Sequence, residues 1–558
     1  MTDRLEPKFV SVLKEGYTLS RLKADALAGL TVAIVALPLS MAIAISSGVT
    51  PERGLYTAIF GGFVVSLLGG SRYQIGGPAG AFIVLIGASV ARNGVEGLIL
   101  ATMMSGLFLM AAGFLRLGKY IKYIPYPVTV GFTAGIGVII FSGEIHDLFG
   151  LTTQGKEPGP LLDKLLYLWS YMGTISLPAT AVAAFTIAVI LIFKRLLPNW
   201  PGLLIAVTLA SLLSVVLHLP IETIGTRFGG IPDRVPMPQL PPLNTDLIIK
   251  VLPDAIAFTL LGAIESLLSA VVADGMSGRR HRSSMELIAQ GAANIASGLF
   301  GGICVTGTIA RTATNVRAGA TSPISGILHS AFVLGFLLVA APLARYIPLA
   351  ALAGVLAFVS YNMVEKSAIG ALFRSSWGDV VVLLATFLMV IFRDLTEGII
   401  VGFVLGAFLF IERMARHVQV SEQPGDLFAD DTEAPEKPFR ATDPDTAVYR
   451  ISGVFFFGAA ATVAAVFDRI GDTHKNFILD CSSVPFLDSS AANVIEGAVR
   501  KAGRGGVRVL IAGASPDARA MLEAHHVKAP AVEYFATFKE AAAAVHLQPP
   551  RFAETKAG

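Results

Sequence analysis

The chain has 558 residues, of which 54% are hydrophobic and 15% are charged, and its formal net charge is +3. Soluble proteins carry about 25% charged residues, so this composition excludes a disordered chain and argues against an ordinary soluble enzyme. The small net charge gives no sign of a nucleic-acid-binding surface, and the two cysteines, Cys304 and Cys481, are too far apart in the sequence to form a metal or redox motif.

Residues 1–23 are rich in charged side chains, and we expect a cytoplasmic segment there rather than a secretory signal. From residue 24 to residue 417 the chain is a succession of apolar runs separated by polar loops. A hydrocarbon core about 30 Å thick is crossed by a helix of about 20 apolar residues. Applied loosely, this criterion predicts about fourteen spans, and therefore an α-helical polytopic membrane protein with its transmembrane domain over residues 24–417.

The loops predict how these spans are oriented. Cytoplasmic loops carry an excess of lysine and arginine. With fourteen spans, the basic loops all fall on one side, and the longer polar stretches 144–164 and 222–250 fall on the other. Both termini are therefore predicted to be cytoplasmic. The basic residues concerned include Arg21, Lys23, Arg116, Lys119, Lys194, Arg195, Arg279, Arg280, Arg374 and Arg413.

Two short segments occupy corresponding places in the two halves of this domain. Residues 76–80 read Gly-Gly-Pro-Ala-Gly and precede a short apolar run, and residues 306–312 read Thr-Gly-Thr-Ile-Ala-Arg-Thr and precede a short helix. Interrupted spans in matching positions mark the binding site of transporters built from inverted repeats. The sequence therefore predicts a ligand site where the two segments meet.

The composition changes after residue 418. Residues 418–446 are rich in proline, aspartate and glutamate, which is typical of an exposed linker. Strand-like and helical patterns then alternate over residues 447–546, and this alternation predicts a small α/β domain, followed by a tail over residues 547–558. We expect strands around a turn at 447–457 and further strands at 477–480 and 506–512, with helices at 459–469, 490–501 and 515–525.

Taken together, these features resemble the SulP family of anion transporters, which includes prestin and the vertebrate anion exchangers. The resemblance covers nearly the whole chain and includes residues 37–42, 262–268 and 480–490, the last of which is similar to the family's cytoplasmic STAS domain. It implies seven-plus-seven inverted repeats arranged as a core and a gate domain, and usually a homodimer.

The first interrupted segment has the properties of an anion site. Gly77, Ala79 and Gly80 leave the backbone open to a ligand, and Pro78 suits a first helical turn. Helix N-termini carry about half a positive charge and bind anions. The alternative is that these residues are small only to let helices pack closely. The mirrored second segment favours the functional interpretation.

Arg311 strengthens that interpretation, because a cation at membrane depth is a functional hypothesis by default. The family resemblance also implies that its position lies at the anion site, with Thr308 and Thr312 as hydroxyl donors. A loop arginine facing water is the alternative, and that role suits Arg317 better. The remaining candidates for the substrate site are Leu39, Ser40, Ile309 and Ala310.

Glu265 is the only carboxylate in the apolar run 255–273, and Ser269 follows it by one helical turn. An intramembrane carboxylate beside an anion site is a natural place to bind a coupling proton. In relatives, a carboxylate and a hydroxyl at this spacing contribute to a cation site, so Na⁺ at Glu265 and Ser269 is the alternative to H⁺. A purely structural partner for Arg311 or for a backbone amide is the third interpretation.

The chain departs from the family pattern in its pocket. Leu39 and Ile43 stand where many members carry glutamine and tyrosine, Ala310 often corresponds to serine, and Ala79 replaces a bulky aromatic residue. We expect a roomier and less polar pocket, and hence a carboxylate-bearing substrate such as a C4-dicarboxylate. A bacterial SulP subgroup of that activity resembles this chain in its Pro-Leu and Ile-Ala-Arg-Thr patterns. Sulfate or bicarbonate is the alternative substrate.

The STAS-like domain offers one candidate regulatory residue. Asp488 and Ser489 open a predicted helix, where either residue is an ordinary cap. Related anti-sigma-factor antagonists are phosphorylated on a serine at this place, so Ser489 is also a regulatory candidate. The chain has no Walker loop or other nucleotide motif, and we predict neither an enzyme nor a resident metal or cofactor.

The leading hypothesis is a proton-coupled, secondary active anion transporter of the bacterial inner membrane. Its expected partners are a small inorganic or organic anion, H⁺ or Na⁺, the lipid bilayer, a second copy of the chain and a cytoplasmic protein at the STAS domain. An anion exchanger, an anion channel or a voltage-responsive membrane protein is the second class. A membrane-anchored signalling scaffold is the third.

Overall fold

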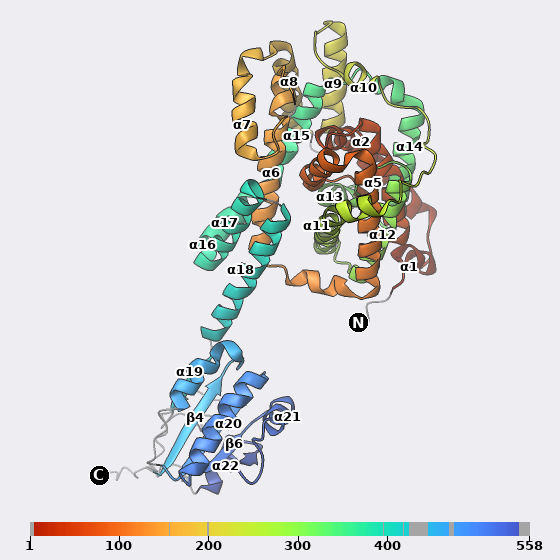
Figure 1. Ribbon diagram of the computed structural model, residues 1–558. Coiled ribbons are helices and arrows are strands. Elements are labelled where there is room, and N and C mark those ends of the chain that lie inside the picture. The colour runs from red at the N-terminus through yellow and green to blue at the C-terminus, as the bar shows by residue number, and fades with distance from the viewer. Residues whose placement is uncertain are drawn as a thin grey trace, which may run out of the picture. The chain divides into compact units, whose positions relative to one another are not determined.

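The computed structural model describes residues 5–155, 157–197, 200–393, 395–416, 418–422, 445–467 and 474–545. By its internal contacts the chain divides into two units, residues 1–406 and 407–558, with the boundary inside the last long helix. The first unit is helical and the second is a mixed sheet with helices (Figure 1).

The first half of the helical unit contains α1 to α9. A π-helical turn, Thr57–Gly61, joins α3 to α4, and a 3₁₀ helix, Gly80–Phe82, precedes α5. The bounds are α1 Lys8–Lys14, α2 Leu19–Ser46, α3 Pro51–Tyr56, α4 Gly62–Leu68, α5 Ile83–Phe114, α6 Tyr126–Phe149, α7 Leu161–Ser170, α8 Leu177–Leu196 and α9 Gly202–Val216.

The second half contains α10 to α18, and short loops join most of these helices. The bounds are α10 Ile224–Phe228, α11 Thr245–Ser277, α12 Ser283–Leu299, α13 Ile309–Arg317, α14 Ile324–Ala344, α15 Leu349–Met363, α16 Lys366–Ser375, α17 Trp377–Phe392 and α18 Leu395–Arg416.

Within the described residues, eight helical stretches are long and apolar enough to cross a membrane, and α9 and α17 are shorter apolar helices. Gly94 has a φ of 68° and interrupts α5, so α5 counts as two segments. The first half then offers seven segments: α2, α3 with α4, the two parts of α5, α6, α8 and α9. The second half offers seven more: α11, α12, α13, α14, α15, α17 and α18. The prediction of a polytopic helical membrane protein is confirmed.

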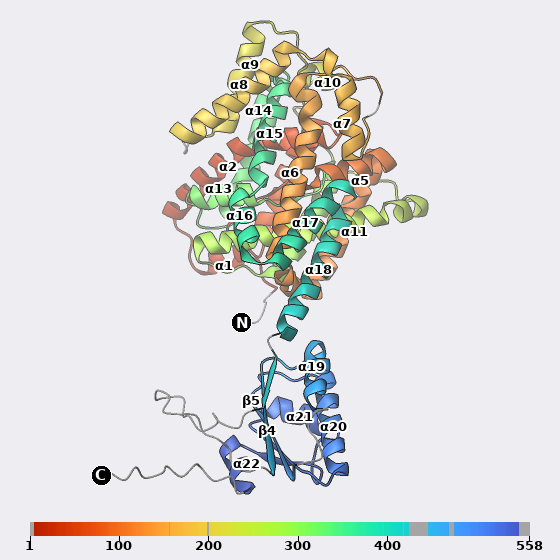
Figure 2. The same ribbon diagram turned by 90° about the vertical axis from the view of Figure 1, so that its left-hand side faces the viewer.

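The helices of this unit form two bundles (Figures 1 and 2). The first bundle comprises α2–α5 and α11–α14, and the second comprises α6–α9 and α15–α18. Glycines allow the backbones to approach closely in both: a Cβ atom on Gly106 of α5 would lie 2.6 Å from the carbonyl oxygen of Gly291 in α12, and one on Gly131 of α6 would lie 2.5 Å from that of Leu383 in α17. The two bundles correspond to the expected core and gate.

The second unit is a five-stranded sheet in the order β3-β4-β5-β6-β7, in which only β3 is antiparallel to its neighbour. Apolar side chains of β5 and β6, such as Phe477, Ile478 and Ile511, are buried under the helices. The bounds are β3 Gln419–Glu422, β4 Thr446–Ser452, α19 Phe457–Phe467, β5 Asn476–Ser483, α20 Ser489–Arg504, β6 Arg508–Ala512, α21 Pro516–Ala524, β7 Glu533–Phe535 and α22 Phe538–Ala544.

The structure differs from the sequence-based expectation at the start of this domain. Strand β3 lies inside the range 418–446 that we expected to be linker, and residues 423–444 of that range lie outside the described residues. The segment 447–457 holds a single strand, β4, followed directly by the approach to α19, so the expected pair of strands around a turn is wrong. The tail 547–558 also lies outside the described residues.

The edge strand gives a first prediction. We expect the fragment 418–545 to unfold cooperatively and to be more stable than the fragment 447–545, because β3 covers one edge of β4 in a register of four residue pairs. Backbone hydrogen bonds contribute about 0.5–1.5 kcal/mol each, and 1 kcal/mol shifts the Tm of a domain of this size by roughly 4–8 °C. Thermal unfolding followed by circular dichroism measures the difference, and equal Tm values for the two fragments would contradict the assignment.

Candidate functional site

The two interrupted segments meet in the first bundle. Residues Gly76–Gly77 form strand β1, residues Thr306–Gly307 form strand β2, and the two strands pair antiparallel with Gly76 opposite Gly307. The backbone N–H of Thr308 donates to the carbonyl of Ile75 at 3.0 Å and extends the pairing. Each strand leads directly into a helix: β1 into the 3₁₀ helix before α5, and β2 into α13. The two helix N-termini are thus tied to each other.

Glycines allow β1 and β2 to pair, and we call the place where the two strands meet the crossing. A Cβ atom on Gly76 would lie 2.7 Å from a methyl group of Val65, and one on Gly307 would overlap the side-chain amide of Gln74. Neither position has room for a side chain, so the two strands pair only if both residues are glycine. The same glycines that marked the segments in the sequence therefore have a packing role as well.

Two threonines that we expected to donate to an anion form hydrogen bonds at the crossing. The Thr308 hydroxyl donates to the carbonyl of Ile75 at 3.3 Å. The Thr312 hydroxyl accepts from the backbone N–H of Ile75 at 3.1 Å and from the Ser269 hydroxyl at 3.0 Å. In this conformation both threonine hydroxyls position α13 relative to β1, and their role as donors to an anion stays a prediction.

A buried polar network that the sequence analysis missed supports the same crossing. The Gln74 amide donates to the Ser266 hydroxyl at 2.7 Å, and Ser266 donates to the Gln290 side chain at 3.2 Å. Asn294 exchanges two hydrogen bonds with the backbone of Val305, at 3.0 and 3.1 Å, just before β2. The available signal was the presence of amide side chains, in α12 and in the loop before β1, within a membrane-spanning unit.

Arg311 is buried at this crossing, with 1% of its surface exposed. Its Nη2 group donates to the Ser40 hydroxyl of α2 at 3.1 Å and to the carbonyl of Pro78 at 3.3 Å. Nε and Nη1 have no hydrogen-bond partner, and no described carboxylate forms an ion pair with the guanidinium. A buried charge is costly unless it is paired, so the free donors of Arg311 suit an anion.

The remaining predicted site residues differ in how far they are buried. Leu39 of α2 and Ala79 are buried, each with 7% exposure, whereas Ala310 is exposed at the start of α13 and Ile309 is half-buried. Gly80 faces the second bundle, because a Cβ atom there would lie 3.2 Å from the end of the Ile140 side chain in α6. Residues of α6 thus lie next to the site, a placement that the sequence did not indicate.

Glu265 stands on α11, which packs against α13 and whose Gly262 carbonyl accepts from the Thr306 hydroxyl at 3.3 Å. It is 7% exposed and makes no hydrogen bond or ion pair with any described residue. Ser269, one turn further on, donates to Thr312 rather than to Glu265. The interpretation of Glu265 as an ion-pair partner of Arg311 is therefore wrong for this conformation.

His329 of α14 is a further polar residue that the sequence analysis missed. It is fully buried, both of its ring nitrogens lack a hydrogen-bond partner, and the positive charge of Arg311 acts on it. The sequence feature that could have identified this residue is that it is the one histidine in the largely apolar span 324–344.

The arrangement is suited to bind an anion. The first-turn N–H groups of the two helices have no intrahelical acceptors, and their termini carry partial positive charge. Arg311 adds a full charge with unpaired donors between them. Among the described residues no cluster of three or more His, Cys, Asp or Glu side chains is arranged to hold a metal ion.

Gly77 gives a second prediction, because a Cβ atom there would overlap Nη1 of Arg311. We expect Gly77→Ala to displace the guanidinium and to weaken binding of a small anion by about 100-fold, the effect expected of a misplacement near 1 Å. Gly87→Ala is the matched control, since its Cβ would lie 3.8 Å from the nearest atom. Equilibrium binding to both purified variants measures the effect, and unchanged affinity in Gly77→Ala would contradict the geometry.

In the second unit, Asp488 rather than Ser489 caps α20, since the Asp488 carboxylate accepts from the backbone N–H of Ala491 at 2.9 Å. The same carboxylate accepts from the backbone N–H of Phe457 at 3.0 Å. Ser489 is exposed, and its hydroxyl lies 3.6 Å from the sulfur of Met521. Phosphorylation of Ser489 therefore stays a prediction.

Each of the two units matches a known protein family. The family model described as "Sulfate permease family" matches residues 22–386, and the model described as "STAS domain" matches residues 438–541.

Among curated proteins, the chain is similar to the putative sulfate transporter YvdB of Bacillus subtilis (strain 168). The two are 37% identical over 510 residues, which cover 91% of this chain and 94% of that protein. The bicarbonate transporter BicA of Picosynechococcus sp. is 31% identical over 523 residues, with 90% of each chain covered.

Two solved structures are similar to this chain. The transmembrane domain of a cyanobacterium bicarbonate transporter BicA matches with a TM-score of 0.63 at 30% identity, covering 71% of this chain and 100% of that chain. The overall structure of SLC26A9 matches with a TM-score of 0.84 at 17% identity, covering 96% of this chain and 92% of that chain. At 17% identity, the second match shows a shared fold alone.

Proposed function

Because this chain belongs to the sulfate permease family and carries a STAS domain, we propose that it is a secondary active transporter that binds an anion at Arg311. The resemblance to the SulP family is confirmed by these matches. The curated relatives reported above are named as transporters rather than enzymes, and we infer the same class for this multi-pass membrane protein.

One observation carries the proposal. Arg311 is buried between two helix N-termini with two guanidinium nitrogens unpaired and no described carboxylate beside it. If its role were only structural, a carboxylate or a full set of backbone acceptors would be expected around it. An incoming anion would supply the missing acceptors, and transport would follow from movement of the first bundle relative to the second.

For the substrate we propose a carboxylate-bearing anion, with a C4-dicarboxylate as the first candidate. A guanidinium recognises the planar carboxylate group well. Leu39, Ile43 and Ala79, in the two segments that contact Arg311, are apolar and suit a carbon chain. Sulfate would need several more donors, and the Thr308 hydroxyl already donates to the carbonyl of Ile75.

We further propose that uptake is coupled to protons through Glu265, in the bacterial inner membrane with both termini cytoplasmic. Glu265 is a buried carboxylate without a described partner on a helix that packs against α13. A proton bound there would remove one negative charge near the incoming anion, so proton and anion would bind with positive linkage.

Proteoliposomes test the substrate class. Purified protein should take up labelled succinate under an inward proton gradient, and unlabelled C4-dicarboxylates should compete better than sulfate, bicarbonate or chloride. Preferred competition by sulfate would support the class named for the Bacillus subtilis relative, and preferred competition by bicarbonate the class named for the cyanobacterial one. Absence of saturable uptake of any of these anions, with large unitary currents instead, would identify a channel.

A further inference from the structure

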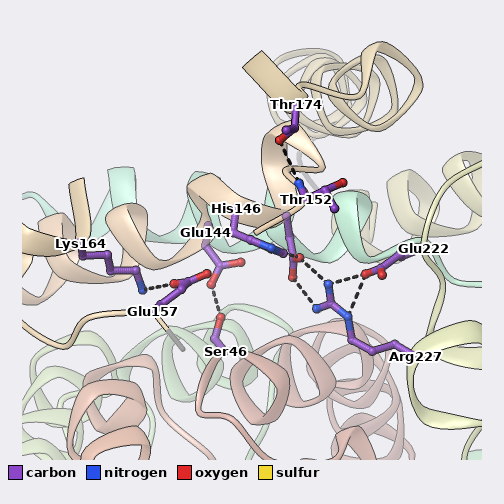
Figure 3. A network of polar contacts seen from close by, with 10 residues as sticks. Ser46, Glu144, His146, Thr152, Glu157, Lys164, Thr174, Glu222 and Arg227 are labelled. Carbon is purple, nitrogen blue, oxygen red and sulfur yellow. Dashed lines mark hydrogen bonds and ion pairs between the residues drawn. The ribbon is translucent and has the colours of Figure 1, made fainter. Parts of the chain in front are cut away.

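A polar contact joins the two bundles at one end of α2. The Ser46 hydroxyl, in the last turn of α2, donates to the carboxylate of Glu144 in α6, and Figure 3 shows this bond between the two helices. Helix α2 belongs to the first bundle and α6 to the second. The contact therefore has to break if the bundles separate at this end.

The Glu144 carboxylate is poorly compensated where it stands. Only 4% of the residue is exposed, and Ser46 is its one hydrogen-bond partner among the described residues. The charged groups that act on it are Lys164, Asp147 and Glu157, and each is engaged elsewhere (Figure 3). Lys164 pairs with Glu157 at 3.1 Å, and Asp147 pairs with Arg227 at 3.0 Å.

The other elements packed on α6 do not supply a counter-charge. Helix α15 has no charged residue. The charged groups that act on Glu144 come from α6 itself, from α7 and from the loop before α7. Near the C-terminal ends of α8 and α17, Lys194 donates to Asn362 at 3.1 Å, and Arg393 pairs with Glu397 at 3.3 Å. His146, next to Glu144 on α6, bonds to Asp147 at 2.8 Å. The contact with Ser46 thus holds a buried carboxylate without a cation of its own.

The contact is also close to the anion site along both helices. On α2, Ser40 accepts from Arg311, and Ser46 lies six residues further along the same helix. On α6, Ile140 faces Gly80 at the start of the interrupted segment, and Glu144 follows one turn later on the same face. A change at Glu144 therefore reaches the two helices that border the site.

We propose that Glu144 is a second proton-binding group of the transport cycle, one that closes this end of the molecule when protonated and releases it when ionised. The proposal rests on the proposed function, because it describes how access to the Arg311 site is regulated. It is separate from the coupling proposed for Glu265, which lies on α11 in the first bundle.

The burial of Glu144 determines whether acid favours the closed or the open conformation. In the structure, where Ser46 and Glu144 are in contact, Glu144 is buried and has one neutral donor among the described residues, and we take this contact as the closed conformation. Such burial disfavours the charged form of a carboxylate. When the bundles separate, water reaches Glu144 and the charged form is stable at neutral pH. The closed conformation therefore binds one more proton than the open one, so acid favours closure and alkali favours opening, by up to about tenfold in their ratio per pH unit.

Distance measurements between spin labels test this in the full chain. Ala91→Cys and Leu166→Cys place labels on exposed positions of the first and second bundle near this end, and both native cysteines are buried. Between about pH 5 and about pH 8 we expect the short-distance population to fall. With Glu144→Gln, which mimics the protonated form, we expect it to stay high at every pH.

Two further variants complete the test. Ser46→Ala removes the only donor and should raise the long-distance population while keeping the pH dependence. Glu96→Gln, which removes an exposed carboxylate of α5 that is not among the charges acting on Glu144, should behave like the unmodified chain. Unchanged pH dependence in Glu144→Gln, or a distance that never changes with pH, would overturn the proposal. Because this readout needs no substrate, it is independent of whether the anion site at Arg311 is correctly assigned.

Discussion

Replacing Arg311 with alanine is expected to abolish most anion binding while leaving the protein folded. The change removes the full positive charge of the guanidinium from the site, and hydrogen bonds to charged groups contribute about 1.5–3 kcal/mol each. At 1.4 kcal/mol per factor of ten, the affinity should fall by about 10- to 150-fold. Equilibrium binding of the labelled substrate to purified protein measures the loss.

The fold should tolerate this change because Arg311 has no described ion-pair partner that would be left unpaired, and its hydrogen bonds are to one hydroxyl and one carbonyl. Thermal unfolding of the variant should therefore resemble that of the unmodified chain. Arg317→Ala is the matched control, since Arg317 is an exposed arginine on the same helix. Unchanged affinity in a well-folded Arg311→Ala variant would remove the anion site from this position.

The second large effect is expected at Glu265. Glu265→Gln keeps the shape of the protonated side chain, so the variant should bind substrate but lose the stimulation of uptake by an inward proton gradient. A gradient of one pH unit corresponds to about 1.4 kcal/mol per proton and supports roughly tenfold accumulation. We expect accumulation in the variant to fall to about the level of passive equilibration, measured as tracer uptake into proteoliposomes at fixed membrane potential.

Two controls separate coupling from damage. Glu96→Gln removes an exposed carboxylate of α5 and should leave proton-driven uptake intact. Counterflow exchange of labelled for unlabelled substrate needs no gradient and should persist in Glu265→Gln. If the variant accumulates substrate as well as the unmodified chain does, Glu265 is structural. If an inward Na⁺ gradient alone drives uptake, Glu265 and Ser269 belong to a cation site instead.

The architecture was predictable because its signals are local. Apolar runs separated by basic loops predicted a multi-pass helical unit, and the alternating pattern after residue 447 predicted a small α/β domain. The meeting of segments 76–80 and 306–312 was anticipated from matching interruptions in the two halves, whereas the strand pairing of 76–77 with 306–307 was not. Strand β3 was not predicted, because a four-residue edge strand beside a long acidic stretch has too little pattern to distinguish it from linker.

Site residues were harder to predict where contacts join distant parts of the chain. Arg311 stood out as a cation at the start of a short helix, yet its contact with Ser40 spans 271 residues. Nothing in the sequence distinguished the Thr308 and Thr312 hydroxyls as supports rather than ligands, because their acceptors and donors are Ile75 and Ser269. The contact between Ser46 and Glu144 depends on how two bundles lie against each other, which local patterns do not encode.

The backbone pairing of β1 with β2 has a kinetic consequence. Main-chain hydrogen bonds tie the two interrupted segments together. The protein groups described at the Arg311 site therefore all belong to the first bundle, and they would move with it as a single body. A carrier whose site moves intact offers the same donors to an anion arriving from either face of the bilayer. Its intrinsic half-saturation constants for influx and efflux would then be alike, and the direction of net flux would be set by the gradients alone.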